Sequence, residues 1–153
     1  MPTMQFTCDI NAPIDRVWAF HNTVESLFKL TPPDKHARLV GVPEPMCAGV
    51  IYRIQIRLFG MVPLTMHSLI REYTPPNGFV DIQLPGKGPF KSWEHQHRLT
   101  AISPDCTRLV DHLTYTLPLG PLGLLANALF ARRDIEKMFA YRHMVTKREV
   151  ENH

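Results

Sequence analysis

Apolar and polar side chains alternate through the middle of the chain with a period of two residues. In the clearest stretch one face carries only apolar and aromatic side chains, namely Val50, Tyr52, Ile54, Ile56 and Leu58. The intervening Arg53, Gln55 and Arg57 are charged or polar. Because neighbouring side chains of a β-strand point to opposite faces, this alternation predicts a strand with one face on a core and one in water.

Further strands are predicted over residues 3–10, 62–73, 79–84, 90–102 and 109–117. Turn-forming residues separate several of them: Gly60, Pro75-Pro76-Asn77-Gly78, Pro85-Gly86-Lys87-Gly88-Pro89 and Ser103-Pro104-Asp105. Short turns between consecutive strands favour antiparallel pairing.

Three segments have helical signals instead. Asn11 can cap a helix that begins near Pro13, and Thr23 can cap a second helix that ends at Thr31-Pro32-Pro33. A much longer helix is predicted from Leu124 to about Arg148, since this stretch contains no proline or glycine. Residues 119–123 before it are either a loop or the start of this helix. Its stripe of side chains at helical spacing consists of Leu125, Ala128, Ile135 and Phe139, with Arg132 in its middle.

The order of elements is therefore one strand, two short helices, about six strands and a long helix. This order predicts an α+β fold in which a strongly curved antiparallel sheet wraps around the C-terminal helix. The 153 residues contain no repeat, low-complexity stretch or linker, so a single domain over residues 1–153 is expected. A curved sheet that grips one helix leaves incompletely packed space between the two, which predicts a cavity.

The last two strands are expected to form a hairpin around the turn at Ser103-Pro104-Asp105. Pairing Leu99 with Leu109 keeps their apolar faces on the same side of the sheet. The same register places three further pairs opposite each other: Trp93 with Tyr115, His95 with Leu113, and His97 with Asp111.

His97 and Asp111 are the candidate catalytic pair. Both are polar residues on an otherwise apolar face, where each needs a hydrogen-bonding partner. In one interpretation Asp111 orients the imidazole and His97 exchanges a proton with a ligand. In the other, the pair is a structural hydrogen bond that fixes the register of the hairpin.

His95 and His97 lie two residues apart on one strand, so both rings leave the same face. With Asp111 opposite, they could form a site with two histidines and one carboxylate for iron or zinc. No other cluster of metal ligands in the sequence supports this reading. We therefore expect no metal and no other cofactor.

The predicted cavity has mainly apolar walls with a few polar anchors, as small-molecule pockets do. The residues predicted to bind ligand are Tyr52, Ile54, Met66, Ile70, Asp81, Gln83, Trp93, His95, Leu113, Tyr115, Leu125, Ala128, Arg132, Ile135 and Phe139. Asp81 and Gln83 lie on the same face of their strand. Alternation alone does not tell whether this face lines the cavity or lies at a solvent-exposed edge of the sheet. Core packing remains the alternative for Tyr52 and Tyr115.

Two hypotheses account for Arg132. It can hold a ligand carboxylate across the cavity mouth, or it can lay its stem along the core and extend its head into water. Residues 122–130, followed by Arg132 and Arg133, also resemble a helix that lies on a membrane surface. We expect the sheet to cover their apolar face, which leaves no role for a membrane.

Composition excludes several classes of protein. The net charge of +3 arises from basic residues scattered along the chain, unlike the clustered positive charge of nucleic-acid-binding domains. Three widely spaced cysteines, Cys8, Cys47 and Cys106, form no metal or disulfide pattern. We see neither a signal peptide nor a run of ~20 apolar residues. These features predict a cytoplasmic protein, without stable membrane insertion, that is a monomer or a weak homodimer.

Three motifs resemble the START-related SRPBCC superfamily of polyketide cyclase/dehydrase-like proteins, in particular a bacterial branch of undefined function. They are Asn11-Ala12-Pro13-x-x-x-Val17-Trp18-x-Phe20, Gly88-Pro89-Phe90-x-x-Trp93-x-His95-x-His97 and Thr107-Arg108-Leu109-x-Asp111-x-Leu113-x-Tyr115-x-Leu117-Pro118. The resemblance covers nearly the whole chain. It implies the helix-grip fold, with a hydrophobic cavity between the sheet and the long helix. It does not name a ligand, because this fold serves carriers, cyclases, hormone receptors and oxygenase domains alike.

We therefore expect the protein to bind a hydrophobic or aromatic small molecule, either lipid-like or polyketide-like. The first alternative is a cyclase, dehydratase or isomerase that uses His97 and Asp111 for proton transfer. The second is a protein-interaction module whose groove is filled by its own side chains. The sequence contains no GxSxG, HExxH or phosphate-binding glycine motif, so it leaves the question of enzymatic activity open.

Overall fold

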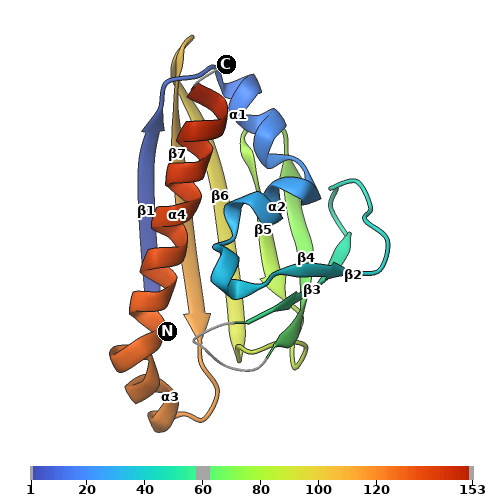
Figure 1. Cartoon of the computed structure of the whole chain (residues 1–153), viewed down its shortest axis with the longest axis vertical. Helices are drawn as coiled ribbons and strands as arrows, with labels where there is room; N and C mark the ends of the chain where they lie inside the picture. The colour runs from blue at the N-terminus through green and yellow to red at the C-terminus, as the bar shows by residue number, and fades with distance from the viewer. Residues whose placement is uncertain (1, 58–62, 152–153) are drawn as a thin grey trace.

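The computed structural model describes residues 2–57 and 63–151, which form one curved antiparallel sheet with helices on one face (Figure 1). The seven strands follow the order β1-β7-β6-β5-β4-β3-β2. Their bounds are β1 (Thr3–Ile10), β2 (Arg38–Val40), β3 (Ile51–Ile56), β4 (Leu64–Thr74), β5 (Gly78–Gln83), β6 (Ser92–Ser103) and β7 (Cys106–Thr116). The strand face assigned to Leu58, the turn at Gly60 and the strand start at Val62 lie outside the described residues.

Two short helices follow the first strand, as the sequence predicts. They are α1 (Ile14–His21) and α2 (Val24–Leu30), and the hydroxyl of Thr23 caps α2 by accepting a hydrogen bond from the backbone N–H of Ser26. A single 3₁₀ turn, η1 (Pro33–Lys35), then leads into the edge strand β2. Together with the long C-terminal helix, these elements confirm the predicted fold class.

The C-terminal helix begins at Pro121 and is not uniform. Helix α3 (Pro121–Ala126) passes through a π-helical turn, η2 (Asn127–Ala131), into α4 (Arg132–Glu151). Of the two alternatives for residues 119–123, a loop or a helix start, the structure shows the helix start. Pro121 occupies the first turn, where the missing N–H of proline has no helical partner to lose. Among the described residues, no helix is both long and apolar enough to cross a membrane.

Helix α3 extends past the ends of β1 and β7, so no strand lies beneath it (Figure 1). Leu125 and Ala128, which were predicted to face the sheet, are not covered by it, and Leu125 is 56% exposed. The side chain of Arg132 is also 56% exposed and pairs with Glu136 at 3.3 Å. The predicted stripe is therefore correct only from Ile135 onward, because helical spacing does not reveal where the sheet ends.

Two apolar clusters hold the helices on the sheet. In the first, Val17 and Trp18 of α1 pack against residues such as Leu99 and Leu109 of β6 and β7. In the second, Ile135, Met138 and Phe139 of α4 pack over β7 and β1, and the ring of Phe139 stacks on that of Phe6 at 4.7 Å between centroids. Burial of each such side chain contributes about 1.5–3 kcal/mol.

The register predicted for the hairpin is confirmed. Strands β6 and β7 pair Trp93 with Tyr115, His95 with Leu113, His97 with Asp111 and Leu99 with Leu109. The outer strand β1 then pairs with the far edge of β7.

Gly78 offers a sharp test of the packing around this hairpin. Its φ is +141°, and an added Cβ would lie 1.8 Å from the carbonyl oxygen of His97. Gly78→Ala should lower the free energy of unfolding by at least about 3 kcal/mol, because the neighbouring strand has to move. Gly86 is the matched control: its φ is +71° and an added Cβ would meet no atom within 4 Å. Gly86→Ala should cost only about 1–2 kcal/mol. Equal losses in urea denaturation would contradict the close approach of β5 and β6.

Candidate functional site

A cavity of about 130 Å³ lies between the sheet, α2 and α4. Much of its wall is apolar and includes Leu27 and Leu30 of α2, Ile54 of β3, Met66 and Ile70 of β4, and Phe139 of α4. An engineered apolar cavity of about 150 Å³ takes up benzene. The space therefore suits roughly one aromatic ring, with the rest of a larger ligand in the mouth of the cavity.

Eight of the predicted ligand-binding residues line this cavity: Tyr52, Ile54, Met66, Ile70, Asp81, Trp93, His95 and Phe139. Apart from Asp81, those from strands lie on the sheet face that the alternation assigned to the interior. The alternation left the face of Asp81 open, and the structure places it on the cavity wall. The hydroxyl of Tyr52 donates to the backbone oxygen of Glu44 at 2.7 Å, so its polar end already has a partner in the protein.

Four other predicted residues are buried away from the cavity wall. Gln83 holds the β5–β6 connection, since its amide donates to the oxygen of Phe90 at 2.6 Å and accepts from the nitrogen of Phe90 at 3.1 Å. The hydroxyl of Tyr115 bonds to the side chain of Asn127 and thereby ties β7 to η2. Leu113 and Ile135 belong to the apolar cluster beneath α4.

The remaining three predicted residues lie outside the cavity altogether. Leu125 lies in α3, Ala128 in η2 and Arg132 at the first position of α4, and none of them lines the cavity. For Arg132 the structure matches the reading in which its head extends into water, and it contradicts the reading in which it reaches across the cavity mouth.

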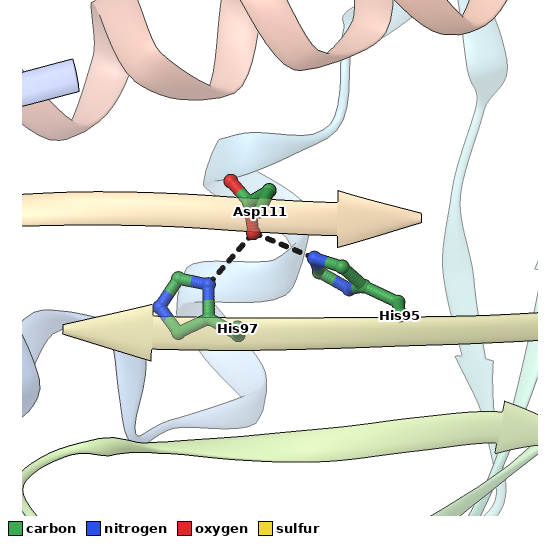
Figure 2. Close-up of side chains that lie close together, drawn as sticks. All are labelled: His95, His97 and Asp111. Carbon is green, nitrogen blue, oxygen red and sulfur yellow. Dashed lines mark hydrogen bonds and ion pairs between the residues drawn. The ribbon is translucent and has the colours of Figure 1, made fainter. Parts of the chain in front are cut away.

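Asp111 is the centre of a buried polar cluster next to the cavity. One of its oxygens, Oδ1, faces both Nε2 of His95 at 2.6 Å and Nδ1 of His97 at 2.9 Å (Figure 2). The other oxygen, Oδ2, lies 2.8 Å from Nε2 of His143 on α4. Burial opposes ionisation of Asp111, but the surrounding imidazoles hold its pKa well below its usual range.

His95 connects this cluster to the cavity. Its second ring nitrogen, Nδ1, faces Oδ1 of Asp81 at 3.0 Å, and Oδ2 of Asp81 also accepts from Nε1 of Trp93 at 3.2 Å. Burial by itself lowers the pKa of His95, but Asp111 and then Asp81 raise it to about 9. With a carboxylate at each nitrogen, His95 is a buried imidazolium that donates two hydrogen bonds.

His97 is enclosed by side chains and is not among the residues that line the cavity. Its ring lies 4.4 Å from that of His21 and 5.0 Å from that of Phe79, measured between centroids. Burial lowers its pKa more than Asp111 raises it, so the ring is neutral near pH 7 and donates from Nδ1. Its Nε2 is buried without a hydrogen-bonding partner among the described residues.

The sequence did not predict several residues of the site, among them Leu27 and Leu30 on the cavity wall and the polar residues His143 and Arg142 of α4. His143, which bonds to Asp111, lies four residues after Phe139, which itself lies four after Ile135, so the helical stripe contained a signal for it. Arg142, which lines the cavity from α4, lies three residues after Phe139 and seven after Ile135, so the same stripe contained a signal for it too.

The atoms of His95, His97 and Asp111 that could bind a metal lie within 4.8 Å of one another. Tetrahedral zinc with bonds of about 2.1 Å needs its ligand atoms about 3.4 Å apart. The carboxylate oxygen lies only 2.6 and 2.9 Å from the two imidazole nitrogens. These distances fit hydrogen bonds and do not fit such a zinc site.

The raised pKa of His95 makes stability depend on pH. The folded protein keeps a proton up to about pH 9, whereas the unfolded chain loses it near 6.5. The stabilisation is therefore complete below pH 6.5 and disappears as the pH rises through 9.

We expect the free energy of unfolding, measured by urea denaturation, to fall by about 3 kcal/mol over this pH range. His95→Gln should remove this loss and Asp81→Asn should reduce it. His112→Gln, on the opposite face of β7, is the control. An unchanged slope in His95→Gln would contradict the buried imidazolium.

Solved structures share this fold over almost the whole chain. The Zhui aromatase/cyclase from a Streptomyces species matches with a TM-score of 0.74 and 16% identity, covering 98% of this chain and 93% of that one. A START superfamily protein from Mycobacterium smegmatis matches with 0.73 and 12%, covering 98% and 97%. Protein TTHA0849 from Thermus thermophilus matches with 0.73 and 19%, covering 96% and 95%. The chain therefore has the START-like fold that its resemblance to the SRPBCC superfamily implies.

No curated protein matches the chain. One family matches, described as "Domain of unknown function (DUF8410)", and the match covers residues 8–150. This range includes both short helices and all the residues of the Asp111 cluster. Because the match spans nearly the entire sequence, the chain belongs to the DUF8410 family.

Proposed function

We propose that the protein binds a hydrophobic or aromatic small molecule in the cavity beneath α4. The observation that carries this proposal is the unfilled, largely apolar space between α2, α4 and strands β3 to β5. Burial of apolar ligand surface there contributes about 25 cal/mol per Å² before the cost of ordering the ligand. The open space also argues against a groove filled by the protein's own side chains.

The contacts of the polar cluster favour binding over catalysis. His97 is shielded from the cavity by its neighbours, and both ring nitrogens of His95 already face carboxylates. A general acid or base must come within hydrogen-bonding distance of the substrate atom, directly or through one water molecule. In a binding protein the same cluster supports one wall of the cavity, with Trp93 and Asp81 at its surface.

We also propose that the protein works in the cytoplasm, as a monomer or weak homodimer, and without nucleic acid. Cys8, Cys47 and Cys106 are all free thiols, which agrees with a reducing compartment.

The first experiment is extraction and mass spectrometry of whatever small molecule leaves the expression host with the protein. Calorimetry with indole then tests the cavity directly. Met66→Trp fills the space and should weaken indole binding at least tenfold. Ile51→Trp is the matched control, because Ile51 is a half-exposed apolar residue on the neighbouring strand and does not line the cavity. Equal affinities in both variants, or no indole binding and no extracted molecule, would reject the proposal.

His97→Gln separates the binding protein from the enzyme. In the binding protein, this substitution should change indole affinity by no more than about 1–2 kcal/mol. Loss of turnover of the extracted molecule in a folded His97→Gln variant would instead establish the enzyme.

A further inference from the structure

Arg142 of α4 is a cation on the cavity wall without an anionic partner among the described residues. Its guanidinium carbon lies 5.6 Å from the centre of the Phe139 ring, which also lines the cavity. Its Nε is buried and has no hydrogen-bonding partner among residues 2–57 and 63–151, and no carboxylate in these ranges forms an ion pair with it. Arg142 as a whole is half-buried, but a buried guanidinium N–H without a hydrogen-bonding partner is costly unless another group pairs with it.

The groups around Arg142 do not neutralise it. His21 lines the same cavity, and burial together with the positive charges of its neighbours holds its pKa well below its usual range. Asp111 interacts with these rings, but His95, His97 and His143 already occupy its oxygens. Asp81, the carboxylate that lines this cavity, pairs with His95 and donors such as Trp93. Arg142 is therefore a cation beside an apolar wall that no carboxylate of the described residues contacts.

We propose that the natural ligand carries a carboxylate, which pairs with Arg142 while the apolar part of the ligand lies against Ile54, Met66 and Phe139. This inference rests on the proposed ligand-binding function and names the chemical class of the ligand. A planar guanidinium matches a carboxylate with two parallel hydrogen bonds, and such a pair gains strength where water is excluded.

The test compares trans-cinnamate with its neutral amide, which has nearly the same shape. By calorimetry the unmodified protein should bind cinnamate at least tenfold more tightly than cinnamamide. Arg142→Gln should remove this preference and leave the affinity for the amide within about twofold. Arg132→Gln, on the exposed start of the same helix, is the matched control and should keep the preference.

Each outcome has a distinct meaning. Equal binding of the two molecules by the unmodified protein overturns the carboxylate inference and leaves the proposed function standing. Binding of neither molecule, together with no indole binding, overturns both. Circular dichroism of Arg142→Gln confirms that the variant is folded, and Arg142→Lys, which keeps the charge, should retain part of the preference.

A second observation concerns the opposite end of the C-terminal helix. Six large apolar side chains are at least 55% exposed on α3, η2 and the turn just before them: Leu119, Leu122, Leu124, Leu125, Leu129 and Phe130. We call these six residues the apolar tip. The tip projects beyond the sheet (Figure 1), and exposed apolar patches of this kind mark contact sites with proteins or membranes.

The charges next to the apolar tip indicate what covers it. Arg132 and Arg133 follow it directly, and the sequence contains no Asp or Glu between Asp111 and Asp134. A second copy of the chain docked tip to tip would bring these like charges together. An anionic bilayer surface instead offers apolar depth for leucine and phenylalanine and phosphates for the arginines.

We infer that the apolar tip docks reversibly on an anionic membrane surface. The protein should float with vesicles of phosphatidylcholine that contain phosphatidylglycerol, and much less with pure phosphatidylcholine vesicles. Phe130→Asp should abolish flotation, and Arg133→Gln should weaken it. Val42→Asp is the control, because Val42 is an apolar residue that is 88% exposed but lies far from the tip in sequence. Absence of flotation overturns the inference. So does a dimer in solution that Phe130→Asp dissociates.

Discussion

The ionised carboxylate of Asp111 is the interaction on which the interior depends. It is 1% exposed, and a charge at that depth is tolerated only when its oxygens are fully engaged. Its three imidazole partners come from β6 and α4, so one side chain of β7 joins the sheet to the helix. Removal of the carboxylate would leave a buried imidazolium at His95 with only Asp81 as its counter-ion.

This cluster also explains why the space beneath the helices is divided. Helix α4 rests on β1 and β7 through an apolar cluster, and there the side chains pack closely. Over β3 to β5 the cover includes α2, which is only seven residues long, and the cavity lies there. His95 stands on the boundary between the packed half and the open half, where its imidazolium is held between the carboxylates of Asp81 and Asp111.

Alternation along the chain was sufficient to predict six of the strands, their antiparallel pairing and the position of His97 opposite Asp111. It did not give the short edge strand β2 or the place of β1 beside β7. It was not sufficient to predict that His95, rather than His97, lines the cavity. That difference depends on the side-chain conformations of the two residues and on the side chains that pack around them. Asp81 and His143 meet His95 and Asp111 only through contacts between distant segments, which a single sequence does not encode locally. The exposed start of the final helix escaped prediction for a similar reason: leucines at helical spacing look the same whether a sheet lies beneath them or not.

The position of β1 has a consequence for how the chain acquires its structure. This first strand pairs only with β7, so that Thr3 lies beside Thr114, far later in the chain. When the first half of the chain has been synthesised, β1 is therefore present but its pairing partner β7 is not. Closure of so distant a contact is entropically expensive and slows folding. The sheet can become whole only after β7 has been synthesised, and the nascent β1 segment must stay unpaired until then.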